Sequence, residues 1–76
     1  MKFPRYIPDG SRKLTYEDLA AEAYTYEIDY DGEKRYNVLT YSGTKSQPDF
    51  HYRYQTEDAR SAAIDAWLAT LRGQPR

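Results

Sequence analysis

Residues 24–30 (YTYEIDY) alternate between large apolar and polar side chains. Three tyrosines and an isoleucine fall on one face of an extended segment, and the polar residues between them fall on the other. The pair Asp31-Gly32 follows at once and is typical of a two-residue hairpin turn. Residues 33–41 (EKRYNVLTY) then resemble a returning strand. The pattern therefore predicts an antiparallel β-hairpin over residues 24–41.

Two further elements follow a polar loop. Residues 50–55 (FHYRYQ) alternate again, with aromatic rings on one side, which predicts a third strand. Thr56 is a typical helix N-cap, and apolar side chains recur at helical spacing after it, so residues 57–72 are predicted to form a helix. The apolar stripe of this helix consists of Ala63, Ile64, Trp67, Leu68 and Leu71.

The N-terminal part of the chain is less regular. Residues 1–13 contain two prolines and an Asp-Gly pair, and they are predicted to form an irregular arm. Residues 14–23 (LTYEDLAAEA) allow two interpretations. Thr15 could cap a short helix with acidic residues in its first turn, or extended structure could run through residues 14–16.

Together these elements predict an α+β fold, a three-stranded antiparallel sheet with the C-terminal helix packed on one face. A short N-terminal helix would be added if residues 14–23 are helical. We expect the tyrosines of the first strand and the aromatic row of the third to face Trp67. The middle strand is apolar on both sides, with Tyr36 and Val38 on one and Leu39 and Tyr41 on the other. One of these pairs must be exposed or covered by the N-terminal arm.

The composition sharpens this picture. The chain has 76 residues, which predicts one small domain, and nine of them are tyrosine against two Phe and one Trp. Tyrosine suits half-buried surfaces and is enriched at protein interfaces. The formal net charge of −1 lacks the positive excess that nucleic-acid-binding proteins normally carry. No segment resembles a signal peptide or a membrane span, so we expect a soluble, cytoplasmic protein.

The sequence offers little catalytic chemistry. His51 is the only histidine and there is no cysteine, which excludes the usual clusters of nitrogen and sulfur ligands for a metal. Glu27 and Asp29 share a strand face, but a domain of this size provides no cleft to desolvate a carboxylate pair. Each glycine lies at a predicted turn or helix end, so there is no phosphate-binding loop. We therefore expect a protein that is not an enzyme and uses no metal or cofactor.

Protein recognition is the function class that remains. Three carboxylates lie beside tyrosine rings at the predicted hairpin tip, a combination that suits a basic partner surface. The predicted partner-binding residues are Asp29, Tyr30, Asp31, Glu33, Tyr36 and Tyr41, and His51 and Arg53 form a second candidate patch. The alternative is a module that binds single-stranded nucleic acid through the aromatic and basic side chains of residues 50–55. Whether the chain forms a homodimer is left open.

Residues 41–71 contain the run SGTKSQPDFHYRYQTEDARSAAIDAWL, in which a Gly/Lys loop, a proline and an aromatic-rich strand precede a Thr-Glu-Asp-Ala-Arg helix start. This part, about two fifths of the chain, resembles small proteins carried by phages, plasmids and other mobile elements. Some of those proteins are encoded in regions that hold antirestriction and anti-CRISPR genes. The resemblance implies a role in evading host defence. An anti-CRISPR protein of this kind would bind a Cas protein or other defence effector and occlude its basic surface.

Overall fold

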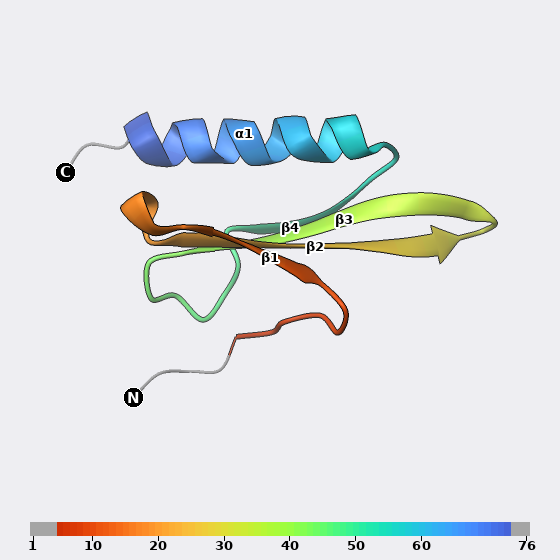
Figure 1. Ribbon diagram of the computed structural model, residues 1–76, viewed down its shortest axis with the longest axis horizontal. Coiled ribbons are helices and arrows are strands. Elements are labelled where there is room, and N and C mark those ends of the chain that lie inside the picture. Colours follow the sequence, from red (N-terminus) through yellow and green to blue (C-terminus); the bar gives the residue numbers. More distant parts are fainter. Residues whose placement is uncertain (1–4, 74–76) are drawn as a thin grey trace.

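The computed structural model describes residues 5–73 and has an α+β fold. Figure 1 shows a four-stranded antiparallel sheet in the order β1-β2-β3-β4, with one helix, α1, lying across one face. The elements are β1 (Arg12–Tyr16), the 3-10 turn η1 (Glu17–Leu19), β2 (Ala21–Tyr30), β3 (Glu33–Ser42), β4 (Phe50–Tyr54) and α1 (Glu57–Gly73). The predicted fold class is confirmed, but the sheet has four strands rather than three. Residues 1–4 of the predicted arm lie outside the described residues.

The additional strand, β1, combines residues 14–16, for which the sequence allowed two interpretations, with Arg12 and Lys13, which were predicted to belong to the irregular arm. Residues 14–16 are extended and pair with residues 21–23, so residues 14–23 do not form a helix. They form parts of two strands joined by η1. Pairing satisfies the backbone of both segments, and Leu14 and Tyr16 pack against the core beneath α1. This tertiary gain outweighs the helix propensity of the neighbouring alanines.

The hairpin is confirmed and is longer than predicted. β2 and β3 are ten residues each, and Tyr30 pairs with Glu33 across the turn. The two turn residues, Asp31 and Gly32, have φ angles of 56° and 81°. Positive φ at both central positions is what a type I′ turn requires, and this turn matches the twist of the flanking strands.

The main core lies between α1 and the sheet. The helix begins at the predicted residue and ends one residue later than predicted, at Gly73. Ala21 and Ala23 of β2 lie beneath it, and their small side chains allow the helix to approach the sheet closely. The rings of Phe50 and Trp67 meet edge to face with centroids 6.4 Å apart. The buried members of this core are Ala21, Ala23, Val38, Ile64, Trp67 and Leu68.

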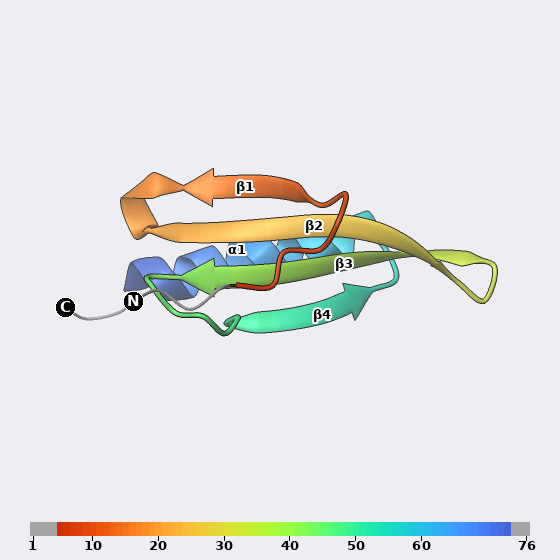
Figure 2. The same cartoon turned by 90° about the horizontal axis from the view of Figure 1, so that it is seen from below.

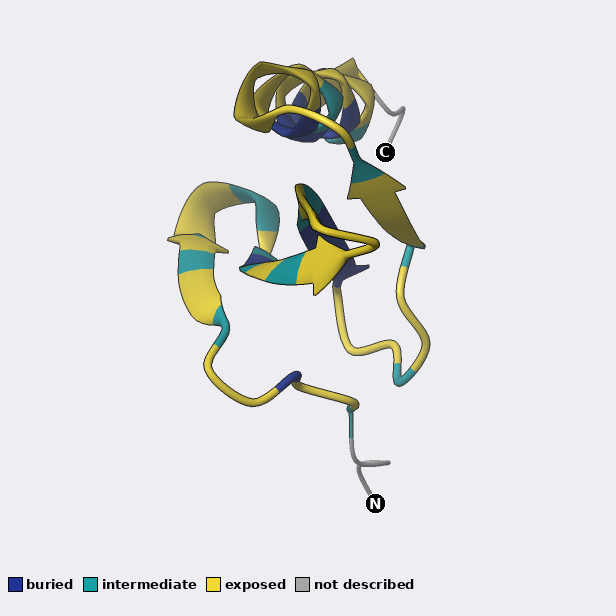
Figure 3. Ribbon diagram, turned by 90° about the vertical axis from the view of Figure 1, so that its right-hand side faces the viewer, coloured by how far each residue is buried: buried dark blue, intermediate teal, exposed yellow. Residues whose placement is uncertain are grey.

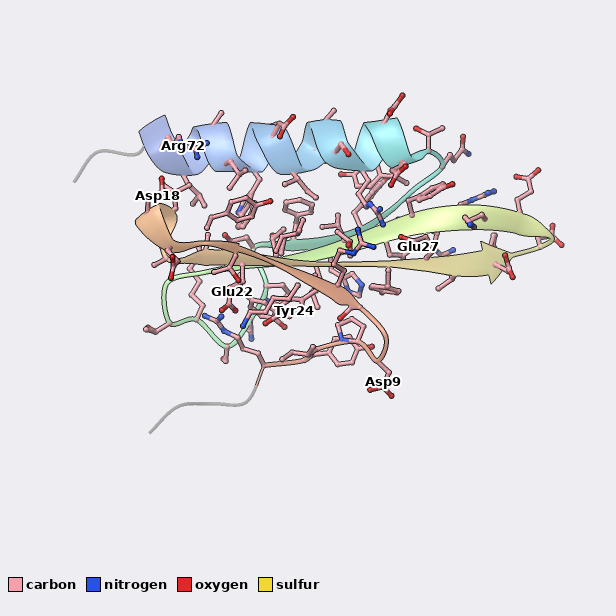
Figure 4. All side chains as sticks on the ribbon, viewed as in Figure 1. Asp9, Asp18, Glu22, Tyr24, Glu27 and Arg72 are labelled. Carbon is pink, nitrogen blue, oxygen red and sulfur yellow. The ribbon has the colours of Figure 1, made fainter. Side chains whose placement is uncertain are left out.

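The tyrosines of β2 lie on the other face of the sheet, so the prediction that they face Trp67 is wrong. Thr25 pairs with Val38, which pairs with Tyr52, and these three side chains are therefore on the side of α1. Figure 4 shows Tyr24 pointing away from α1. Alternation defines which residues share a face. The alanines at the start of β2, outside the predicted strand, select the face that meets the helix.

A smaller core occupies the face away from α1. It consists of buried Tyr24, Leu39 and Tyr41, with the two rings edge to face at 6.0 Å. The N-terminal segment crosses this face (Figures 2 and 3). There the Tyr41 hydroxyl donates a 2.7 Å hydrogen bond to the carbonyl of Tyr6, and the Arg5 guanidinium lies 4.7 Å from the Tyr41 ring centre. The N-terminal arm therefore covers Leu39 and Tyr41, one of the two apolar pairs of β3. Coverage by this arm was one of the two outcomes expected from the sequence.

Candidate functional site

The end of the β2–β3 hairpin projects beyond the rest of the sheet. β1 pairs with β2 only as far as Thr25, and β4 pairs with β3 only as far as Tyr36. Among the described residues, residues 28–35 therefore have no strand beside them, and we call them the hairpin arm. Its three strand pairs extend it by about 10 Å at about 3.3 Å per residue. The projection is clear in Figures 1 and 2.

The charge of the hairpin arm is more balanced than the acidic residues alone suggest. Asp29, Asp31 and Glu33 are all exposed, as predicted for a contact surface. However, Asp29 stands opposite Lys34 in the register, and Glu33 forms a 3.0 Å ion pair with Arg35. Three carboxylates and two basic side chains leave the arm with a net charge of −1. Exposed pairs of this kind contribute about 0.2–1 kcal/mol, so the arm offers shape and aromatic area more than bulk charge.

Tyr30 links the two patches that the sequence treated separately. Its side chain is half-exposed, and the Arg53 guanidinium lies 4.7 Å from the ring centre. The Arg35 guanidinium lies 5.8 Å from the same ring. Arginines over a tyrosine face attract the ring quadrupole and restrict its motion. One surface, on the side of the sheet away from α1, therefore combines Tyr30 with Arg35 and Arg53.

His51, the other member of the second patch, belongs to a hydrogen-bonded chain on this same face. Its Nε2 lies 2.8 Å from the Tyr26 hydroxyl. That hydroxyl accepts a 3.2 Å bond from Nδ2 of Asn37 and can therefore donate its own hydrogen to Nε2. The ring of His51 is also 6.5 Å from the ring of Tyr6 in the N-terminal arm. Through these contacts His51 holds β4 against β2 and the N-terminal arm on this face.

Two other predicted contact residues lie elsewhere. Tyr36 is on the side of α1, half-buried, with the Arg60 guanidinium 5.4 Å from its ring centre. Tyr41 is fully buried beneath the N-terminal arm, so its ring is not part of an exposed surface. Different segments cover the two faces of β3: Arg60 of α1 lies over Tyr36, and Tyr6 and Arg5 of the N-terminal arm contact Tyr41. The exposed site therefore retains Tyr30 and excludes Tyr41.

Arg60 is a functional candidate that the sequence reasoning missed. It is buried at 6% exposure, and its Nη1 forms a 2.8 Å ion pair with Glu27 Oε2. The same nitrogen lies 3.4 Å from the carbonyl oxygens of Tyr26 and Asn37. These contacts join α1 to the base of the hairpin arm. The signal was available, because Arg60 precedes Ile64 by one helical turn and so lies on the apolar stripe.

Asp49 anchors the loop between β3 and β4 to the helix. Its carboxylate accepts 2.9 Å hydrogen bonds from Trp67 Nε1 and from Lys45 Nζ. Burial alone would raise the pKa of Asp49, but these hydrogen bonds favour the charged form more strongly. The pKa therefore lies below its ordinary value. The Trp67 ring is thus fixed at its polar end as well as packed on the sheet.

The arrangement of β4 bears on the nucleic-acid alternative. The rings of Tyr52 and Tyr54 have centroids 4.8 Å apart and lie on the side of α1. His51 and Arg53 project from the opposite face of the same strand. A stacking platform needs rings and basic side chains on one surface, so β4 by itself does not provide one.

Residues 5–73 show neither a metal-binding cluster nor a membrane-spanning helix. No group of three or more His, Cys, Asp or Glu side chains in this part of the chain is placed to hold a metal ion. The helix in this part of the chain is not long and apolar enough to cross a membrane.

Comparisons of the chain with protein-family models, curated proteins and solved structures found no match.

Proposed function

We propose that this chain is a small non-enzymatic protein-binding inhibitor, of the anti-CRISPR or related anti-defence class. In this proposal the hairpin arm enters a groove of a Cas protein or other host defence effector and blocks the groove's basic surface. The observation that carries the proposal is the projecting arm with half-exposed Tyr30 near its tip. The resemblance of residues 41–71 to mobile-element proteins supports the choice of partner class.

The arm has the shape that insertion requires. Residues 28–35 are narrow, because no third strand of the described sheet flanks them, and they extend about 10 Å beyond the last three-stranded section. Tyrosine buries a large apolar area with few rotatable bonds and is among the residues that dominate binding energy at interfaces. Tyr30 would therefore provide most of the affinity. Asp29 and Asp31 would orient the tip toward basic side chains and raise the association rate.

The arm is also held in place before a partner arrives. Arg60 fixes its base through Glu27, and Arg53 of β4 lies over the Tyr30 ring from across β3. Side chains that are already ordered lose less conformational entropy on binding, so preorganisation increases affinity. The fold therefore supports a rigid insert rather than a flexible loop.

The test is a plasmid-survival assay in cells that carry an active CRISPR–Cas system, combined with co-purification of the tagged chain. We expect the wild type to protect the plasmid and to retain a Cas protein. Tyr30→Ala should lose both properties. Tyr6→Ala is the matched control, because Tyr6 is 62% exposed, Tyr30 is 53% exposed, and Tyr6 lies outside the hairpin arm.

Reversing the charge of the hairpin tip tests whether electrostatic attraction contributes to partner binding. The triple change Asp29→Lys, Asp31→Lys and Glu33→Lys should weaken protection, because it turns the tip basic. A triple variant that protects as well as the wild type would show that the arm is not the contact surface. Salt-sensitive binding of a labelled oligonucleotide, with no retained protein, would instead support the nucleic-acid alternative.

A further inference from the structure

The strand β4 ends the sheet on the side opposite β1 and leaves one backbone edge unpaired within the described chain. Natural edge strands are usually protected by proline, lysine, bulges or a covering segment. Phe50–Tyr54 contains neither proline nor lysine, and its one arginine, Arg53, lies over the Tyr30 ring. Tyr52, at the centre of the strand, is 59% exposed. The edge is therefore open to pairing with another strand.

An apolar groove runs beside this edge, between β4 and α1. It has a volume of about 490 Å³. Phe50, Tyr52 and Tyr54 form its strand side. Ala63, Ala66 and Thr70 form much of its helix side, with side chains too short to fill the space. An incoming strand would thus meet an open backbone edge and a space for its rings together.

The two flanks of α1 differ in charge. The flank toward β4 is formed by small uncharged residues, among which Ala63 and Ala66 line the groove. At 100° per residue, the charged side chains of the described helix fall elsewhere, with Glu57, Asp65 and Arg72 toward β1 or solvent. A flank without charge can be brought against an identical flank without repulsion. Charges at these positions would oppose themselves across a two-fold axis.

We propose that the occupant of this edge is a second copy of the chain, paired antiparallel through β4 about a two-fold axis at Tyr52. The strand is self-complementary in this register. Tyr52 meets the Tyr52 of the other copy, and Phe50 meets Tyr54, so aromatic rings pair on the groove side. On the other face His51 meets Arg53 of the other copy.

The resulting dimer has one continuous eight-stranded sheet, with both copies of α1 on the same face and their alanine flanks turned toward each other. Because the paired strands are antiparallel, the two hairpin arms point away from each other at opposite ends of the sheet. The dimer therefore presents two copies of the exposed Tyr30 surface. Dimerisation through β4 requires no partner at the hairpin arm.

The test is the mass of the purified full chain, measured by light scattering and sedimentation equilibrium across roughly 1 µM to 1 mM. We expect the wild type to approach twice the chain mass of 8.9 kDa as concentration rises. Tyr52→Lys places a charge on the strand edge, and Ala66→Glu places one on the alanine flank. Each should weaken dimerisation by at least about tenfold.

Two matched controls keep the result specific. Ile7→Lys places the same charge on a large apolar residue of similar exposure in the N-terminal arm, and Ser61→Glu makes a similar change at an exposed position on the charged flank of α1. Both should dimerise like the wild type. Ala66 is exposed, so its variant should fold even if Tyr52→Lys does not. A wild type that stays monomeric at every concentration, or a dimer that both interface changes leave intact, would overturn the proposal.

Discussion

The substitution Arg60→Ala removes the side chain that joins α1 to the base of the hairpin arm. In the native structure the guanidinium is 2.8 Å from the Glu27 carboxylate and 5.4 Å from the centre of the Tyr36 ring. The Arg60 side chain is 8% exposed, whereas the Glu27 side chain is 43% exposed. The ion pair is thus buried on one side and screened by solvent on the other.

The expected loss follows from these contacts. A half-screened ion pair is worth about 1 kcal/mol, near the upper end for exposed pairs. Losing the packed arginine stem and the donor facing two backbone carbonyls adds about 1–2 kcal/mol. The total is about 2–3 kcal/mol. In a domain of this size such a loss lowers Tm by about 10–20 °C.

Urea unfolding monitored by Trp67 fluorescence measures this difference in the free energy of unfolding. Arg60→Met keeps most of the stem and should lose about half as much stability as Arg60→Ala. Glu57→Ala is the control, because Glu57 is 70% exposed and lies 3.6 Å from the same guanidinium. It should cost only a few tenths of a kcal/mol. If Arg60→Ala is as stable as Glu57→Ala, Arg60 does not hold the arm to the helix.

Three further changes test other parts of the structure. The pKa of Asp49 is lowered when folded, so its charge stabilises the protein above about pH 4, and this contribution is lost as pH falls through the lowered pKa. The difference in unfolding free energy between the wild type and Asp49→Asn should therefore shrink in acid; a pH-independent difference would contradict this. Tyr41→Phe removes the hydroxyl hydrogen bond to the Tyr6 carbonyl and should lower the free energy of unfolding in urea by about 1 kcal/mol. An unchanged free energy of unfolding would show that the N-terminal arm is not docked on Tyr41 in solution. Gly32→Ala places a side chain at φ 81° and should lower stability by about 1 kcal/mol in thermal unfolding, and an unchanged Tm would argue against the type I′ turn.

The sequence predicted elements whose signals are local. Asp31-Gly32 specifies a turn through its own backbone preferences, and the helix after Thr56 follows from a cap and one apolar stripe. β1 could not be predicted as firmly, because residues 14–16 become a strand only by pairing with residues 21–23. The segment between them has helix-forming residues, and a tertiary contact overrides that preference.

The candidate site depends on contacts between strands, which the alternation of apolar and polar residues along one strand does not reveal. Asp29 and Tyr30, two of the predicted contact residues, are exposed, but the position of Lys34 opposite Asp29 follows only from the register of the hairpin. The contact of Tyr30 with Arg53 joins the ends of two strands that are not neighbours in sequence. Tyr36 and Tyr41 are both tyrosines of β3 and lie on opposite faces of the sheet. Only the path of the N-terminal arm decides that Tyr41 is fully buried.

The most direct test of the proposed function is co-purification of the tagged chain from cells that carry an active CRISPR–Cas system, with the wild type, Tyr30→Ala and Tyr6→Ala compared in parallel. If the hairpin arm is the contact surface, the wild type and Tyr6→Ala retain a Cas protein. Tyr30→Ala then binds at least about tenfold more weakly, a loss of about 1.4 kcal/mol. Retention of the same protein by Tyr30→Ala at wild-type level would contradict the account.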